Sequence, residues 1–170
     1  MRGRGFTMIE ILAVMVLLGL AAGVVAVNIR GPMRRASLEE VVGRIVDFDG
    51  QTRAIARRQG RPLRLRVDLY AGRLARTDAE SGEELGAPAV VPGGWRIEKL
   101  RVRDEQIGSG TATLSGSRRG LSPSYALLLV GPHGERRWLL CAGLSGHFTQ
   151  CESYEEIENI LAEAARDHAD

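Results

Sequence analysis

Cysteines and recognisable catalytic motifs are scarce in this chain of 170 residues. Two cysteines, Cys141 and Cys151, are too few for a disulfide scaffold, and neither belongs to a C-x-x-C motif or a cluster of metal ligands. The sequence has no phosphate-binding loop, no G-x-S-x-G, no H-E-x-x-H and no calcium-binding EF-hand loop. Because no nucleophile, base and orienting group can be nominated together, we expect neither an enzyme nor a cofactor site.

Metal-binding side chains are also too dispersed to suggest a metal centre. Asp47 and Asp49 stand close together in V-D-F-D-G, but they fall within a helical pattern and no further acids accompany them. The three histidines, His133, His147 and His168, are scattered and are expected to be ordinary surface or loop residues.

Excess charge is almost absent. The net charge is +2, and without Arg2 and Arg4 the chain has 21 basic and 21 acidic residues, which disfavours a generic nucleic-acid binder. The distribution is uneven, however: residues 30–76 carry twelve arginines against five acids, and residues 136–170 carry three arginines against seven acids. This asymmetry is compatible with electrostatic docking between subunits and equally with solvated surfaces.

One long stretch lacks charge altogether. No charged residue separates Glu10 from Arg30, and the 22 residues 6–27 would form a helix of about 33 Å, enough to cross a bilayer core. A carboxylate in such a segment costs ~2.5–3.5 kcal/mol, so Glu10 requires an explanation. A secretory signal peptide, with small residues at 21–23 for cleavage, does not supply one. A capping box formed by Thr7 and Glu10 at the start of the helix would explain the position of Glu10.

The stretch Gly5-Phe6-Thr7-Met8-Ile9-Glu10 follows a short basic leader and precedes the apolar helix. It closely resembles the prepilin processing motif of type IV pilins and type II secretion pseudopilins. The resemblance implies that a prepilin peptidase cuts after Gly5 and methylates the new amino group of Phe6. It also implies that Glu10 pairs with the N-terminal amine of an adjacent subunit during filament assembly. The leader would be cytoplasmic, the helix would lie in the bacterial inner membrane, and the rest would be periplasmic.

Beyond the apolar run, the pattern predicts a second helical stretch and then strands. Gly31-Pro32 is expected to bend or locally melt the helix, and Gly60-Arg61-Pro62 to end it. Arg44, Asp47, Arg53, Arg57 and Arg58 are assigned to its polar faces. The helical spacing predicts one apolar face, comprising Leu38, Val41, Val42, Ile45, Val46, Thr52, Ile55 and Ala56.

Alternation and turn residues predict strands in the second half of the chain. They cover residues 63–69, 74–77, 95–102, 111–115, 125–130, 136–141 and 147–150, with 78–88 as a loop. A short C-terminal helix follows at 153–167. We therefore expect an α+β fold with these segments: a leader (1–5), a transmembrane and assembly helix (6–29), an amphipathic helix (30–61), an antiparallel β-rich head (62–151) and a C-terminal helix (152–170).

Three segments of the head resemble the GspH/FimT type of minor pseudopilin, within a type IV pilin-like fold. They are residues 52–62, running into a strand, and the turns Arg119-Gly120-Leu121-Ser122-Pro123 and Leu144-Ser145-Gly146. The helix after Cys151 departs from that type. The resemblance implies a structural subunit of a type II secretion pseudopilus, whose partners are prepilin peptidase, other pilin subunits and a secreted protein substrate.

Two alternatives stay open. One is a minor type IV pilin that binds DNA in competence or twitching, and the other is a single-pass anchored binding module. Candidate phosphate-binding residues are Arg57, Arg58, Arg61, Arg64, Arg66, Arg118, Arg119, Arg136 and Arg137. The segment Ser145–Gln150 lacks the Gly-Arg pattern expected of DNA-binding FimT-like pilins, so only weak DNA binding is expected.

The two cysteines allow one further expectation. In an oxidising periplasm, Cys141 and Cys151 could form a disulfide that joins the last strand to the C-terminal helix.

Overall fold

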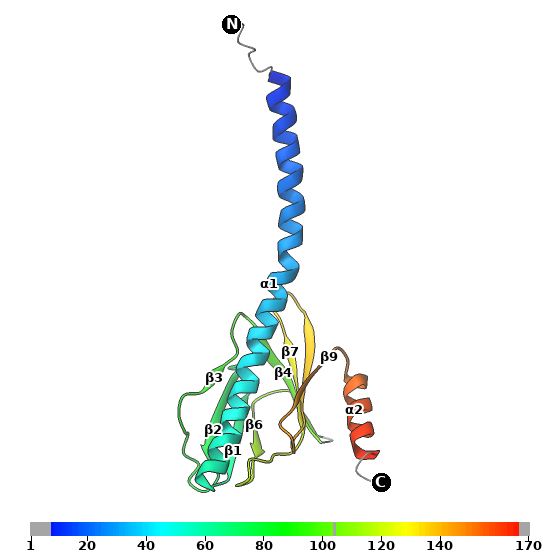
Figure 1. Cartoon of the computed structure of the whole chain (residues 1–170). Coiled ribbons are helices and arrows are strands. Elements are labelled where there is room, and N and C mark those ends of the chain that lie inside the picture. Colours follow the sequence, from blue (N-terminus) through cyan, green and yellow to red (C-terminus); the bar gives the residue numbers. More distant parts are fainter. Residues whose placement is uncertain (1–7, 104, 167–170) are drawn as a thin grey trace. The chain divides into compact units, whose positions relative to one another are not determined.

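A computed structural model gives the structure of the protein and describes residues 8–103 and 105–166, of which residues 21–36 and 162–166 are described by their backbone alone (Figure 1). The chain divides into two compact units, Met1–Glu39 and Glu40–Asp170. One long helix, a run of antiparallel strands and a short final helix follow one another, which confirms the predicted α+β class.

Helix α1 spans Met8–Gln59 and is continuous through Gly31 and Pro32. The prediction that these two residues locally melt the helix is therefore wrong. A proline removes one hydrogen bond from the ladder, but the turns on either side keep theirs, so the helical backbone continues. The helix ends where predicted, because Gly60 adopts the left-handed conformation (φ 61°) and the amide of Arg61 bonds back to the carbonyl of Ala56 at 3.3 Å.

The buried stripe of α1 in the head unit differs in its centre from the predicted one. Val41, Ile45, Thr52 and Ala56 are buried as expected, whereas the other predicted members are only half-buried. Phe48, Asp49 and Arg53 complete the buried stripe. Assigning Arg53 to a polar face was wrong, because the spacing 41, 45, 49, 53 is that of one continuous helix face.

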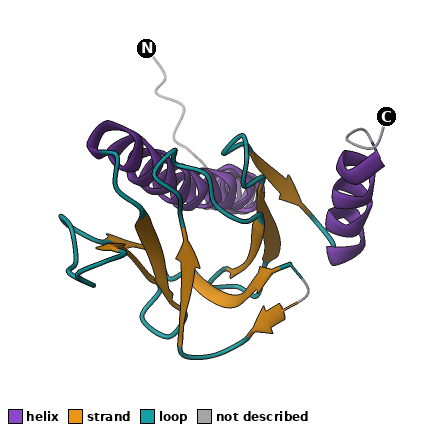
Figure 2. Ribbon diagram, turned by 90° about the horizontal axis from the view of Figure 1, so that it is seen from below, coloured by secondary structure: helices purple, strands orange, loops and turns teal. Residues whose placement is uncertain are grey.

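The strands form two antiparallel sheets beside this part of α1 (Figure 2). The four-stranded sheet has the order β3-β2-β1-β6 and the five-stranded sheet the order β5-β4-β7-β8-β9. Their bounds are β1 Leu63–Asp68, β2 Arg73–Asp78, β3 Ala89–Val90, β4 Arg96–Val102, β5 Glu105–Ile107, β6 Thr111–Ser115, β7 Tyr125–Val130, β8 Arg136–Cys141 and β9 Phe148–Cys151. All seven predicted strands are present within one or two residues, and β3 and β5 were not predicted.

Strand β7 lies at the centre of the five-stranded sheet and is buried along its whole length. Tyr125, Leu127 and Leu129 alternate with Ala126, Leu128 and Val130, so both faces of the strand are covered. The second set belongs to an apolar cluster with Trp138, Leu140, Cys151 and Ile157.

Helix α2, Tyr154–Arg166, supplies part of this cover. Ile157 of α2 is buried in the cluster, and Tyr154 packs against Trp138 with ring centroids 5.6 Å apart. The guanidinium of Arg101 lies 4.3 Å from the ring centroid of Tyr154. The final helix predicted at 153–167 is thus confirmed within one residue at each end.

Candidate functional site

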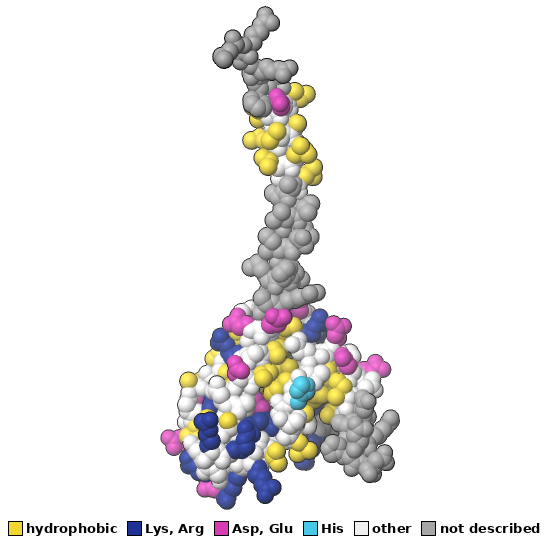
Figure 3. All heavy atoms as spheres, in the orientation of Figure 1, with side chains coloured by type: hydrophobic (Ala, Val, Ile, Leu, Met, Phe, Trp, Pro, Cys, Tyr) yellow, Lys and Arg dark blue, Asp and Glu magenta, His cyan; other side chains and the backbone are white. Residues whose placement is uncertain are grey.

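The first turns of α1 carry apolar side chains with no cover in the structure. From Met8 to Leu20, every large hydrophobic side chain is between 49% and 83% exposed. Residues 14–18 are all apolar, and five consecutive residues of a helix point in every direction around its axis. These side chains therefore surround the helix instead of forming one stripe, and Figure 3 shows one face of them. A helix that is apolar all round normally lies in a protein core or in a membrane.

Glu10 is the one charged residue between positions 8 and 20, and it lies exposed in the first turn of α1. A carboxylate there faces the positive end of the helix dipole. The predicted cleavage residues Gly5 and Phe6, and the capping residue Thr7, lie outside the described residues. Where the residues are described, no helix combines the length and the apolar character needed to cross a bilayer.

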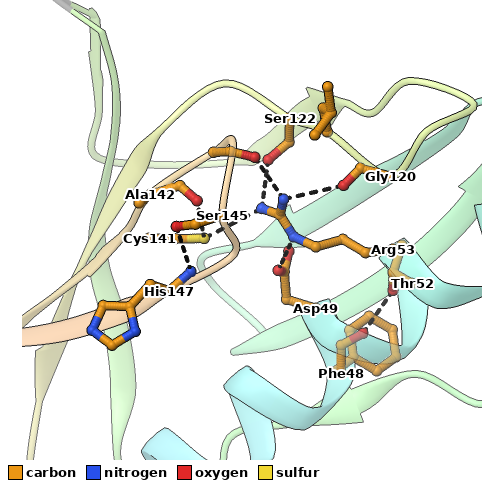
Figure 4. A network of polar contacts seen from close by, with 12 residues as sticks. Phe48, Asp49, Thr52, Arg53, Gly120, Ser122, Cys141, Ala142, Ser145 and His147 are labelled. Atoms are coloured by element: carbon orange, nitrogen blue, oxygen red, sulfur yellow. Dashed lines mark hydrogen bonds and ion pairs between the residues drawn. The ribbon is translucent and has the colours of Figure 1, made fainter. Parts of the chain in front are cut away.

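A second feature of α1 is a buried polar cluster around Arg53. We call it the Arg53 cluster, and its members are Asp49, Arg53, Ser122, Tyr125, Cys141 and the carbonyls of Gly120 and Gly143. Figure 4 shows Asp49, Gly120, Ser122 and Cys141 around the guanidinium of Arg53. Asp49 and Arg53 lie one turn apart and form an ion pair between Nε and Oδ2, with side chains 5% and 9% exposed. The hydroxyl of Tyr125 donates to the other oxygen of Asp49 at 3.2 Å. The carboxylate is therefore bonded through both oxygens.

The guanidinium of Arg53 directs its remaining donors to two loops, residues 116–124 and 142–147, and to the end of β8. Nη1 donates to the carbonyls of Gly143 at 2.7 Å and Gly120 at 3.2 Å. Nη2 donates to the hydroxyl of Ser122 at 2.7 Å and to the Cys141 sulfur at 3.3 Å. A buried arginine with its hydrogen bonds and countercharge in place fixes the positions of the groups around it.

The two loops approach each other closely at Gly143. A Cβ atom there would lie 2.0 Å from the carbonyl oxygen of Ser122, so no larger residue fits without a backbone shift. The three segments that resemble the GspH/FimT type, 52–62, 119–123 and 144–146, thus meet around one side chain. Arg53 bonds to the second segment, and its Nε lies 3.4 Å from where a Cβ of Gly146 would be.

Burial and charge shift the titration of the cluster. For Arg53, burial opposes the charged form, but the hydrogen bond and charge of Asp49 outweigh it and raise the pKa. Burial raises the pKa of Tyr125 well above its ordinary value, and Asp49 adds to the rise. Burial and Asp49 also raise the pKa of the Cys141 thiol to about 11, against the opposing charge of Arg53. The cluster therefore holds a neutral thiol and phenol at neutral pH, which is poor material for nucleophilic chemistry.

The structure does not bring the two cysteines together. Both are buried free thiols, and in the β8–β9 ladder Cys141 lies opposite Phe148 while Cys151 lies opposite Trp138. Cys151 shares its face of the sheet with its partner Trp138. Trp138 and Cys141 are three residues apart on β8, so their side chains, and hence the two thiols, lie on opposite faces of the sheet. Cys141 faces the Arg53 cluster and Cys151 the apolar cluster under α2. The disulfide considered from the sequence is therefore absent here.

The arginines proposed for DNA contact do not form a set of free cations. Arg136 pairs with Glu98, Arg137 with Glu152 at 3.3 Å and Arg61 with Asp78 at 3.3 Å. Arg118 lies 3.9 Å from Glu80. The others, Arg57, Arg58, Arg64, Arg66 and Arg119, are exposed.

Sequence reasoning placed the apolar segment and Glu10 but missed the Arg53 cluster. The available signal was the i, i+4 spacing of Asp49 and Arg53 on the same face as Val41, Ile45 and Ala56. Among the described residues, no group of acidic, histidine or cysteine side chains could hold a metal ion.

Comparisons with known proteins bear mainly on the first of these features. Residues 1–26 match the family model of the prokaryotic N-terminal methylation motif. The minor pseudopilin EpsH from the Type 2 Secretion System of Vibrio cholerae is similar in structure, with a TM-score of 0.49 and 12% sequence identity, over 67% of this chain and 95% of that one. No curated protein sequence matches the chain. The motif match confirms the resemblance drawn from the first residues, while the roles of Gly5, Phe6 and Glu10 stay predictions.

Proposed function

We propose that this chain is a minor pseudopilin, a structural subunit of a type II secretion pseudopilus. Prepilin peptidase cuts it after Gly5 and methylates Phe6, and the amino-terminal helix anchors it in the bacterial inner membrane with a periplasmic head. It then joins a filament through that helix, beside other pilin subunits, and acts on a secreted protein substrate. The observation that carries the proposal is the methylation motif in residues 1–26.

The exposed apolar side chains at the start of α1 support assembly through this helix. Apolar side chains that surround a helix and that no other described residue covers are buried by a lipid or protein environment. A bilayer meets that need before assembly and neighbouring helices meet it afterwards. Glu10 then has a defined role, because a carboxylate among apolar neighbours is tolerated when a cation pairs with it.

The head supports a structural and not an enzymatic role. Its buried ion pair, Asp49 with Arg53, joins α1 to strand β7 and to the loop carbonyl of Gly143, and its buried thiol and phenol are held neutral. Ion pairs occupy several of the arginines that a DNA-uptake pilin would need for phosphate.

Processing provides the most direct test. Protein isolated from cells that contain prepilin peptidase should have N-methylated Phe6 as its first residue, as measured by intact-mass and peptide mass spectrometry. The same protein from cells lacking the peptidase should keep residues 1–5. A signal-peptide cut near Ala22 or Ala26, or an unprocessed chain in both strains, would contradict the proposal.

A further inference from the structure

Strand β6 forms the least protected sheet edge in residues 8–103 and 105–166. At the other three edges, β3 has two residues, β5 has three and includes Glu105, and β9 has four and is contacted by α2. Strand β6 has five residues, T-A-T-L-S, with no charge, proline or register shift. Proteins usually guard a sheet edge with such features, because an open edge is a template for another strand.

The register shows which backbone groups of β6 face outward. On its inner side β6 pairs with β1, and flanking bonds join Gly116 N to Leu63 O at 2.8 Å and Leu69 N to Gly110 O at 3.0 Å. Since bonded and non-bonded pairs alternate in an antiparallel ladder, Ala112 and Leu114 direct their amides and carbonyls towards β1. Thr111, Thr113 and Ser115 direct theirs away from it. No backbone hydrogen bond from the described residues reaches these outward groups.

A groove of about 670 Å³ runs beside this edge, which is within the ~300–1,000 Å³ typical of ligand sites. Thr113, Leu114 and Ser115 of β6 line it, together with Val102 at the end of β4 and Pro123 before β7. The edge therefore has both unused hydrogen-bonding groups and space for an additional segment beside them.

We propose that this groove binds an extended segment of a partner protein as a strand antiparallel to β6, with acidic and apolar residues in alternation. All strand pairs among the described residues are antiparallel, so we assign the same direction to the added strand. This mode of recognition takes its affinity from backbone hydrogen bonds and its specificity from alternate side chains. The inference does not depend on the proposed secretion role.

The alternation follows from the two faces that the added strand would present. Residues opposite Leu114 would point to the inner face, towards Val102 and Pro123, and should be apolar. Residues opposite Thr113 and Ser115 would point to the outer face. There Arg66 and Arg64 are the ladder partners of Thr113 and Ser115, and both arginines are exposed.

The charge around the groove favours acids at these outer positions. Arg64 and Arg66 lie exposed on β1 next to β6, outside the groove lining, and no ion pair within the described residues involves them; Arg103 lines the groove itself. Among the described lining residues Arg103 and Glu105 balance each other, so the excess positive charge comes from Arg64 and Arg66 on the neighbouring strand β1. An acid opposite Thr113 or Ser115 would lie two strands from Arg66 or Arg64, roughly 10 Å between backbones, which the long side chains of glutamate and arginine together span. Their attraction at the exposed face falls with salt.

The test is binding of a fluorescein-labelled, terminally blocked hexapeptide of alternating glutamate and valine to the full-length protein in detergent, followed by fluorescence polarisation. We expect saturable binding, weakened about tenfold or more when lysine replaces glutamate, because opposite charge becomes like charge beside Arg64 and Arg66. Absence of binding up to millimolar peptide, or equal binding of the lysine peptide, would overturn the proposal.

N-methylated peptides test the backbone bonds without changing the protein. In the proposed register the glutamate amides face β6, whereas the valine amides face away. Methylating the glutamate amides should weaken binding about tenfold or more, because each methyl group removes one backbone hydrogen bond to β6, whereas methylating the valine amides should have little effect. Equal effects of the two modifications would refute strand addition at this edge.

Protein variants locate the site. Thr113→Pro removes an outward amide and spares the bonds to β1, so it should abolish binding, whereas Thr113→Ala should preserve it. Arg66→Ala should weaken binding several-fold and reduce its salt dependence, and Arg58→Ala, at the end of α1, should not. Tryptophan fluorescence checks folding. If Thr113→Pro does not fold, the methylated peptides and Arg66→Ala decide the matter. Binding unchanged in Arg66→Ala would place the peptide elsewhere.

Discussion

Two stretches of the same helix, residues 8–20 and residues 41–56 of α1, differ in what surrounds their apolar and charged side chains. The first has apolar side chains exposed around its circumference and one exposed carboxylate. The second buries a carboxylate together with an arginine: Tyr125 of β7 donates to the carboxylate, and loop carbonyls accept from the arginine. Helical propensity does not distinguish the two stretches; the presence of partners within the chain does. Among the described residues the first stretch has no such partners, whereas the second has them; under the proposed function, lipid and neighbouring subunits cover the first.

The strongest test of this difference is removal of Arg53. Arg53→Ala leaves Asp49 buried without its countercharge, and breaking a buried pair in this way costs about 3–5 kcal/mol. We expect the free energy of unfolding, measured by urea denaturation with tryptophan fluorescence, to fall by that amount. Arg57→Ala, one turn later and exposed, is the matched control and should change stability by no more than ~0.5 kcal/mol.

A double variant sharpens the same test. Replacing both charges, as in Asp49→Leu with Arg53→Met, removes the buried carboxylate together with its partner and should recover part of the loss. If Arg53→Ala alone is no worse than Arg57→Ala, the ion pair does not stabilise the head.

Thiol reactivity tests how closed the Arg53 cluster is. With its pKa raised from 9.0 to about 11, Cys141 at pH 8 should have a thiolate fraction ~100-fold below that of an ordinary cysteine. Iodoacetamide labelling of unreduced, folded protein, mapped by mass spectrometry, should be slow at both cysteines and should accelerate in urea. A disulfide-linked peptide containing Cys141 and Cys151 would contradict the observed register.

The same shift makes stability depend on pH in a defined direction. Because the folded pKa of Cys141 is raised, its contribution to stability is complete below pH 9.0 and is lost as pH rises towards about 11. The decline should be smaller in Cys141→Ala, measured against its own stability at neutral pH, and the remainder comes from Tyr125 and Cys151, whose pKa values burial also raises.

Glu10 tests the other stretch, residues 8–20, which lipid and neighbouring subunits cover under the proposed function. Glu10→Ala should leave processing and head stability unchanged and should reduce incorporation into filaments about tenfold, because the amine of a neighbouring subunit loses its countercharge among apolar groups. Glu10→Gln separates the two explanations for this residue. Glutamine can still complete a capping box but carries no charge, so it should also assemble poorly. Normal assembly of Glu10→Gln, measured in sheared filament fractions, would favour the capping role.

The smallest expected effect concerns DNA. Since Arg61, Arg136 and Arg137 already pair with carboxylates, the protein should bind duplex DNA weakly at ~150 mM salt in a gel-shift titration. Arg136→Ala with Arg137→Ala should change that binding little. Sub-micromolar binding lost in this double variant would favour the DNA-uptake alternative.

Strands of ordinary length could be predicted from the sequence because alternation identifies them. Strands β6, β7 and β8 have the predicted bounds. Strands β3 and β5 have two and three residues, which is too short for a period of two to be recognised.

The candidate site was predicted only in part, for a different physical reason. Residues 1–26 carry a motif that local sequence defines, so the start of the chain could be interpreted directly. The Arg53 cluster depends on groups that are distant in sequence, and a charged residue in a helical pattern is usually exposed. Its burial follows from carbonyls that only the folded loops bring within reach.

The bond between Arg53 and the carbonyl of Gly143 also bears on when the head can finish folding. It joins positions 90 residues apart in sequence, so the closing of a long loop precedes it, and contacts of this kind form late. This bond at the carboxyl end of α1 can form only after the chain has been made as far as Gly143, which includes almost the whole head. We therefore expect loss of Arg53 to accelerate unfolding more than it slows folding, which makes this side chain a determinant of the lifetime of the folded head.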